Sequence, residues 1–166
     1  MATIDNLKAA FAGESQANRT YLAFAKKADA EGMKQIAKLF RAAAAAETVH
    51  ALSHLRVMGG VKGTLDNLQA AIAGEGHEFK EMYPQFVAEA VAEGARSAEN
   101  SFKDAMAVEE IHSSLYSEAL TAAKAGNDLP SAKIYVCGVC GNTVVGEVPD
   151  QCPICGARSN KFTEIE

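Results

Sequence analysis

Two copies of a short metal-binding pattern, Glu-x-x-His, lie in the first two thirds of the sequence. Glu47 and His50 form one copy, and Glu109 and His112 form the other. Residues three positions apart on an α-helix lie on one face, one turn apart, so each copy can present a carboxylate and an imidazole to the same ion. In helical bundles, two such copies and one Glu from each of two other helices bind a pair of iron ions. The pattern therefore predicts a carboxylate-bridged di-iron site.

Two further glutamates stand where the other two helices would supply them. Glu14 precedes Glu47 by 33 residues, and Glu75 precedes Glu109 by 34. Each separation takes the chain up one helix and down the next, which returns it to the same level of a bundle. Glu78 is a second candidate beside Glu75. A single Glu-x-x-His is commonly a solvated helix face, but two copies with level-matched glutamates favour a metal site.

The remaining two histidines are interpreted as lying outside the metal site. His54 follows His50 by four residues and could form a zinc-binding pair with it, but His50 already has a partner in Glu47. His77 lies on another face of the helix that carries Glu75, where it would face solvent or support a ligand.

Four cysteines near the C-terminus form two Cys-x-x-Cys pairs that are separated by eleven residues. They are Cys137, Cys140, Cys152 and Cys155. Two such pairs complete a tetrahedral shell of four thiolates, which suits either Zn²⁺ or a single iron. A zinc site would be structural, whereas an iron site would carry one electron.

The composition of the chain changes near residue 130, which separates the helices that must position the first group of ligands from the segment that carries the cysteines. Residues 3–126 are rich in Ala, Glu, Lys and Leu, which favour helix. Four helices are expected, with Thr3 as the first N-cap and Pro84 kinking or dividing the third. Their predicted ranges are 3–32, up to 58, 64–94 and 97–124.

The C-terminal part has a different composition, with all the cysteines, several β-branched residues, and prolines at 149 and 153. Gly126 to Pro130 is typical of a helix stop and linker. We therefore expect a mainly α protein with two domains: a four-helix bundle at 1–128 and a small β/loop metal domain at 131–166.

Composition and charge narrow the class of partner. The 166 residues are 48% hydrophobic and carry a formal net charge of −5, which argues against nucleic acid as a partner. No secretory signal or membrane span is expected. A cytoplasmic location would keep the cysteines reduced and free to bind metal.

The chain resembles rubrerythrin over essentially its full length, in the order di-iron bundle and then rubredoxin-like domain. Cys152-Pro153-Ile154-Cys155-Gly156 resembles the second rubredoxin loop closely. Segments of the helical part that carry the resemblance are Gly13-Glu14-Ser15-Gln16-Ala17, Glu47-Thr48-Val49-His50, residues 67–75 and Met82-Tyr83-Pro84. The resemblance implies a ferritin-like four-helix bundle, with iron in both metal sites; zinc could replace the four-cysteine iron in recombinant protein.

The resemblance also implies a role for each ligand. Glu78 would be the family's additional carboxylate, which can replace a His as the oxidation state changes. Tyr21 and Tyr83 match tyrosines that hydrogen-bond the ligand carboxylates, although either could be a core tyrosine. The implied iron ligands are Glu47 and Glu109 as bridges, Glu14 and His50 on one iron, and Glu75 and His112 on the other.

The implied activity is the reduction of hydrogen peroxide to water. Electrons would enter through the four-cysteine iron from an external donor, such as rubredoxin or an NAD(P)H-dependent reductase. Two alternatives stay open: a ferroxidase or iron-handling protein with the same di-iron site, and a non-catalytic helical scaffold with a zinc ribbon.

The short link between the second and third helices bears on assembly. In ferritin-like bundles these two helices are parallel, which would require the link to span nearly 30 Å (about 1.5 Å per helical residue). The five residues Gly59–Gly63 reach at most about 18 Å. We therefore expect a homodimer that exchanges helical hairpins, against the simpler alternative of an up-down-up-down monomer.

Overall fold

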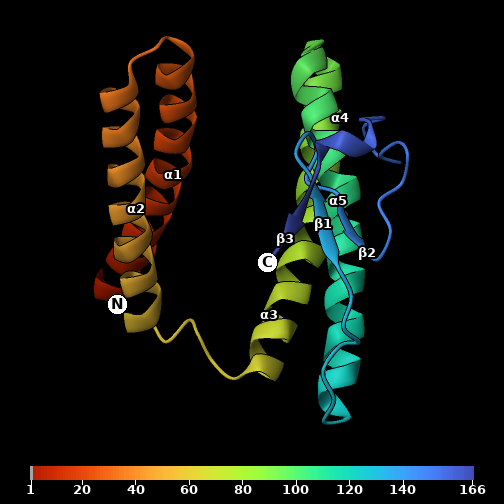
Figure 1. Cartoon of the computed structure of the whole chain (residues 1–166). Helices are drawn as coiled ribbons and strands as arrows, with labels where there is room; N and C mark the ends of the chain where they lie inside the picture. The colour runs from red at the N-terminus through yellow and green to blue at the C-terminus, as the bar shows by residue number, and fades with distance from the viewer. Residues whose placement is uncertain (1) are drawn as a thin grey trace. The chain divides into compact units, whose positions relative to one another are not determined.

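The computed structural model describes residues 2–166 and divides into two compact units, one ending at Lys62 and the other beginning at Gly63 (Figure 1). The first unit is a helical hairpin of α1 (Ala2–Ala30) and α2 (Lys34–Val57). Gly32 has a φ of 79° in the tight turn between them, a conformation that glycine adopts without a Cβ clash.

Small side chains hold α1 and α2 together. Ala25 and Ala28 on α1, and Ala37 and Ala44 on α2, are almost completely buried. Alanine lets the two backbones approach closely, so the alanine-rich composition serves packing as well as helix propensity. An aromatic cluster of Tyr21, Phe24 and Phe40 lies beside this seam, with ring centroids 5.5–6.3 Å apart.

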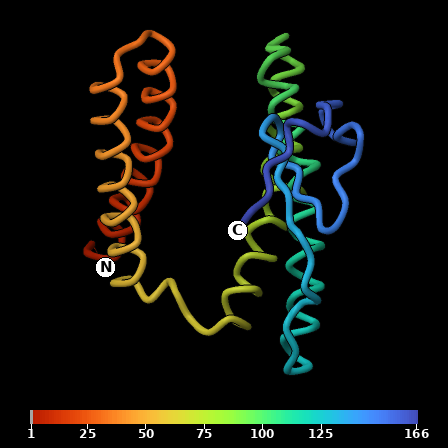
Figure 2. Tube along the Cα trace, in the orientation of Figure 1, coloured from red at the N-terminus to blue at the C-terminus, as the bar shows by residue number. Residues whose placement is uncertain are grey.

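The second unit begins with an interrupted helix, which is the part of the tube in Figure 2 that passes from yellow into green. It consists of α3 (Thr64–His77), a π-helical segment η1 (Glu78–Met82) and α4 (Tyr83–Glu93). Pro84 lies in the first turn of α4. The predicted interruption of this helix near Pro84 is confirmed, because the α-helical pattern gives way to the π-helical segment after His77 and resumes at Tyr83, one residue before the proline.

Helix α5 (Arg96–Lys124) packs against α3 and α4 as the second arm of a hairpin. Gly94, with a φ of 68°, ends α4 in the left-handed conformation. Tyr83, Phe86 and Phe102 form the aromatic contact between α4 and α5, with centroids 5.5–6.3 Å apart.

The C-terminal residues fold into a three-stranded antiparallel sheet in the order β2-β1-β3. Its strands are β1 (Ile134–Cys137), β2 (Thr143–Val145) and β3 (Phe162–Ile165), with a 3₁₀ turn, η2 (Ser159–Lys161), before β3. Cys137, Cys152 and Asn142 are the buried residues of this part.

The predicted succession of long helices and a small strand-containing metal domain is confirmed. Thr3 is an exception in detail, because α1 already includes it from Ala2 onward and it is therefore not the N-cap. Among the described residues, no helix is long and apolar enough to cross a membrane.

Candidate metal centres

The hairpin of α1 and α2 brings together the first group of predicted ligands. Glu14, Glu47 and His50 each offer a ligand atom within 4.8 Å of the others. His50 Nδ1 lies 2.8 Å from Glu47 Oε2, as the spacing of the motif predicts. His50 remains largely exposed within this unit, so this half-site is open to solvent on the histidine side.

Asn18 fixes the register of α1 against α2 next to this half-site. Its side chain is 8% exposed, and Nδ2 donates hydrogen bonds to Ala44 O at 2.6 Å and to Thr48 Oγ1 at 2.8 Å. Asn18 is one turn from Glu14, and Thr48 is the residue after Glu47. Sequence reasoning missed this clamp, although an Asn within a helix, one turn from a ligand, is a signal that could have revealed it.

The hairpin of α3 and α5 brings together the matching second group. Glu75, Glu109 and His112 offer ligand atoms within 4.8 Å of one another, and His112 Nδ1 lies 2.7 Å from Glu109 Oε2. Burial raises the pKa of Glu75, and the neighbouring Glu109 carboxylate raises it further. Two carboxyl groups held this close repel each other unless a proton or a cation lies between them.

Tyr83 and Glu78 flank this second half-site at the two ends of η1. Burial raises the pKa of Tyr83, followed by the charges of Glu78, Glu109 and Glu75. The phenol therefore stays protonated beside these carboxylates. Glu78 is close enough to affect both Tyr83 and Glu75, but it lies outside the three-residue ligand group.

Tyr21 and the two remaining histidines have other surroundings. Tyr21 packs into the aromatic cluster with Phe24 and Phe40. His77 is exposed and lies 3.3 Å from Glu81 on the same helix, in agreement with a solvent-facing position. His54, in the last turn of α2, lies outside the ligand groups of the described chain.

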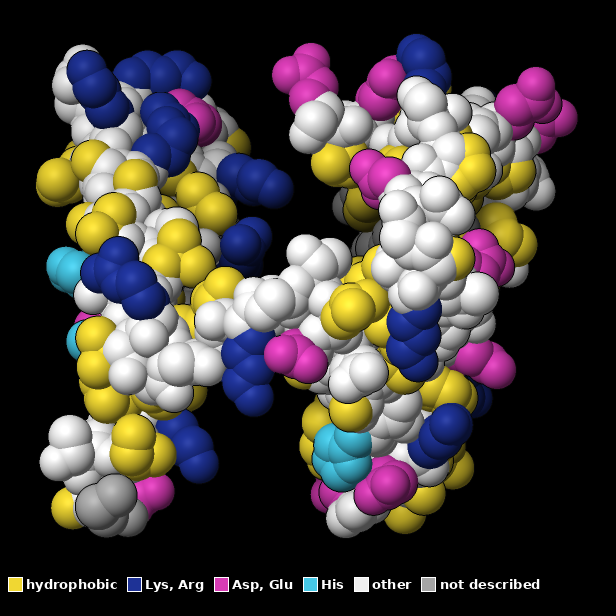
Figure 3. Space-filling model, turned by 90° about the horizontal axis from the view of Figure 1, so that it is seen from below, with side chains coloured by type: hydrophobic (Ala, Val, Ile, Leu, Met, Phe, Trp, Pro, Cys, Tyr) yellow, Lys and Arg dark blue, Asp and Glu magenta, His cyan; other side chains and the backbone are white. Residues whose placement is uncertain are grey.

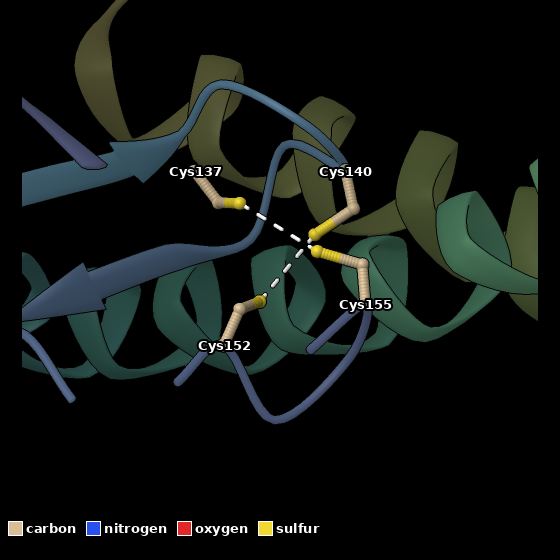
Figure 4. Close-up of side chains that lie close together, drawn as sticks. All are labelled: Cys137, Cys140, Cys152 and Cys155. Atoms are coloured by element: carbon tan, nitrogen blue, oxygen red, sulfur yellow. Dashed lines mark hydrogen bonds between the residues drawn. The ribbon is translucent and has the colours of Figure 1, made fainter. Parts of the chain in front are cut away.

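The four cysteine sulfurs point at a common centre (Figure 4). All four are free thiols, with Cys137 Sγ 3.8 Å from Cys155 Sγ and Cys140 Sγ 3.6 Å from Cys152 Sγ. A tetrahedral ion with metal–sulfur bonds of about 2.3 Å requires sulfurs about 3.8 Å apart. The cage therefore fits a single tetrahedral metal ion.

Hydrogen bonds prepare one thiol of this cage for ionisation. Burial works against the Cys152 thiolate, but the backbone N–H groups of Cys155 and Ile154 outweigh it and lower the pKa of Cys152 to about 7. Burial raises the pKa of Cys140 and of Cys155. The buried Asn142 also places its amide Nδ2 3.6 Å from Cys152 Sγ. Sequence reasoning did not single out Asn142.

Comparison with known proteins places both parts of the chain in one family. The rubrerythrin family model matches residues 5–120, and the model of the rubrerythrin rubredoxin-like domain matches residues 135–163. The chain belongs to the rubrerythrin family. The predicted resemblance and the ferritin-like plus rubredoxin-like fold class are thus confirmed.

Relatives that match over nearly the full length of the chain support this assignment. Rubrerythrin-2 of Clostridium acetobutylicum is 38% identical, over 96% of this chain and 95% of the relative. Nigerythrin of Nitratidesulfovibrio vulgaris is also 38% identical, over 98% and 86%. A solved structure of fully reduced, all-ferrous nigerythrin has a TM-score of 0.59 at 34% identity and covers 98% of this chain and 86% of its own.

The metals follow from the family and the donor sets together. The Glu and His groups are the ligand residues of a non-haem di-iron carboxylate site, and the four cysteines form a rubredoxin-like iron site. Hard carboxylate oxygens suit iron in the first, and four thiolates suit iron in the second.

Proposed function

We propose that this rubrerythrin-family protein is a peroxide reductase. The observation that carries the proposal is the pairing, in one chain, of two equivalent Glu₂His half-sites with a four-thiolate cage. When bound, the two irons supply two electrons that, with two protons, convert hydrogen peroxide into two water molecules. The four cysteines would hold an iron that supplies replacement electrons one at a time from an external donor, such as rubredoxin or an NAD(P)H-dependent reductase.

The ligand roles that we propose are divided between the two hairpins. Glu47 and Glu109 would be the ligands shared by both irons, and Glu78 would be an additional ligand from η1. Glu14 and His50 would hold one iron, and Glu75 and His112 would hold the other. These residues belong to a di-iron domain at 1–128, and the four cysteines to an iron domain at 131–166.

The hydroxyl groups of two tyrosines and the carboxyl group of Glu75 can hold protons at the site. Tyr83 keeps its hydroxyl proton because burial and three carboxylates raise its pKa, so its Oη can donate to a ligand carboxylate. Tyr21 has the corresponding place on α1, two turns beyond Glu14, and we propose the same role for it. Burial, followed by the Glu109 carboxylate, raises the pKa of Glu75, and a cation bound there would offset the same unfavourable charge.

We also propose a homodimer in which chains exchange hairpins, so that each di-iron site draws ligands from two chains. Each hairpin supplies only half of the ligands. The α1–α2 hairpin also leaves Ile36, Leu39, Val49 and Leu52 exposed, and Figure 3 shows hydrophobic side chains on the surface of both units. Two helices with so much apolar surface require further helices to cover them. The four free cysteines fit a reducing compartment, and we propose the cytoplasm.

Stopped-flow absorption tests the activity. Anaerobically reduced, iron-loaded protein is mixed with hydrogen peroxide or with oxygen, and the visible bands of the thiolate-bound iron are monitored. Fast reoxidation by peroxide and much slower reoxidation by oxygen are expected. A preference for oxygen with mineral accumulation would make the protein a ferroxidase, and a colourless, zinc-loaded chain would make it a scaffold.

A further inference from the structure

His112 contacts the rubredoxin-like sheet of its own chain. Its Nε2 lies 2.8 Å from Thr143 Oγ1 on β2, while Nδ1 lies 2.7 Å from Glu109 Oε2. Helix α5 and β2 belong to the same compact unit. Both nitrogens of this imidazole therefore have defined partners, one in the half-site and one in the sheet.

The loop before Thr143 also rests on α5 at this level. A Cβ placed on Gly141 would lie 3.8 Å from Val108 Cγ1, and Val108 is 2% exposed. Val108 precedes His112 by one helical turn. The contact between His112 and Thr143 is thus part of a packed junction, and not an isolated surface pair.

Thr143 is directly connected to the cysteine cage. Its neighbour Asn142 accepts a hydrogen bond from Cys137 N–H at its backbone oxygen, at 2.9 Å, and sends its side-chain amide to Cys152 Sγ, at 3.6 Å. Thr143 Oγ1 also lies 3.4 Å from Gly141 O. The partner of His112 is therefore the immediate neighbour of the residue that hydrogen-bonds the cage.

We propose that Thr143 is a positioning residue for His112. The inference rests on the proposed function, in which His112 is an iron ligand. A histidine that binds a metal through Nδ1 carries its proton on Nε2, and that N–H needs an acceptor to fix the ring. Thr143 Oγ1 is the acceptor, and its own proton turns toward Gly141 O.

The positioning role is tested in the full-length protein by Thr143→Val, with Thr143→Ser as the matched control. Zinc-loaded protein, which is diamagnetic, allows ¹⁵N–¹H correlation spectra of the imidazole nitrogens. Wild type and Thr143→Ser should show an exchange-protected Nε2–H on His112, and Thr143→Val should lose that protection. Affinity for Fe²⁺ at the carboxylate site should fall about 10- to 100-fold in Thr143→Val, as for other lost supporting contacts of a metal ligand.

Neither readout uses peroxide, so both remain valid if the proposed activity is wrong. The absorption of the four-cysteine iron reports whether the variant sheet is folded, and Thr143→Ala replaces Thr143→Val if that absorption is lost. A protected Nε2–H and unchanged Fe²⁺ affinity in the variant without the hydroxyl would overturn the positioning role.

Discussion

At the scale of single residues, the two Glu-x-x-His motifs have the same internal geometry and different neighbours. In both, Nδ1 of the histidine lies within 2.8 Å of the motif's glutamate. Beside His112, however, burial raises the pKa of Glu75 and the Glu109 carboxylate raises it further, so the metal-free site disfavours a charge on Glu75. Beside His50, the notable feature is the Asn18 clamp between the helices.

Glu75→Gln should separate two effects on stability: the destabilising charge of Glu75 in the metal-free protein and its stabilising role as a ligand in the iron-loaded protein. In metal-free protein it should raise the free energy of unfolding by about 0.5 kcal/mol at neutral pH, since it removes a partly screened repulsion. In iron-loaded protein it should lower the melting temperature, because a ligand is lost. Differential scanning calorimetry of both forms measures the two effects, with the exposed Glu110→Gln on α5 as control.

The same substitution predicts a pH dependence. Because the pKa of Glu75 is raised in the folded state, the folded protein binds this proton more tightly than the unfolded chain. Metal-free wild type should therefore gain stability as the pH falls from neutrality toward the raised pKa, relative to Glu75→Gln. An identical pH profile for the two proteins would contradict the shift.

Asn18→Ala should destabilise the protein by about 1–2 kcal/mol, because it removes two hydrogen bonds at a buried position and leaves a small void. Thr48 Oγ1 keeps its own hydrogen bond to Ala44 O at 3.2 Å, so we expect the loss of stability to lie near the lower end of this range. Urea unfolding at fixed protein concentration measures it. Asn6→Ala, at an exposed Asn of the same helix, is the control, and equal stabilities would show that Asn18 is no clamp.

At the scale of elements, the π-helical segment η1 sets the orientation of α4 relative to α3. A π-segment contains one more residue than the α-helical turn it replaces, and such segments are frequent at functional sites. With η1 between them, Glu75 on α3 and Tyr83 at the start of α4 both lie near Glu109 and Glu78. It also directs Tyr83 and Phe86 onto Phe102 of α5.

Deletion of the exposed Lys80 should convert η1 to an α-helical turn and rotate α4 by about 100° relative to α3. Tyr83 would move away from the carboxylates, and Phe102 would lose its aromatic contacts with α4. We therefore expect the free energy of unfolding to fall by at least about 2 kcal/mol and the carboxylate site to lose its iron. Circular dichroism should remain helical. Lys80→Ala, which keeps the chain length, should cost less than about 1 kcal/mol. Full iron loading of the deletion variant would contradict this role of η1.

At the scale of the whole molecule, the two hairpins are complete as packed elements and incomplete as sites. Each gathers two glutamates and a histidine, whereas a di-iron site uses both groups. The residues between α2 and α3 run only from Met58 to Gly63. An exchange of hairpins between two chains would bring both ligand groups together without requiring the short link to span the bundle.

A longer connection should therefore change the assembly. Insertion of about twelve Gly and Ser residues between Gly60 and Val61 gives a flexible link that can span about 30 Å, so one chain could complete its own site. Sedimentation of iron-loaded protein should show a dimer for wild type and a shift toward monomer for the extended chain. A wild-type monomer that keeps its di-iron spectrum on dilution would refute the exchange.

Much of this protein could be predicted from spacing. A separation of three residues on a helix put each histidine beside its glutamate, and the number of residues between helices put Glu14 and Glu75 at the level of the motifs. The two Cys-x-x-Cys pairs predicted the four-thiolate cage, because the short loops leave the sulfurs few other arrangements. These features are local, or depend only on chain length, so the sequence determines them directly.

Other features depended on contacts between residues far apart in the chain. Two such contacts are the bond from Asn18 to Ala44 and the contact of His112 with Thr143, which form where separate elements pack. The hydrophobic periodicity of the sequence does not predict these contacts, because the partner of a buried polar group depends on which other element packs against it. The sequence alone thus predicted the groups of candidate ligands, and the tertiary structure decided which residues contact them.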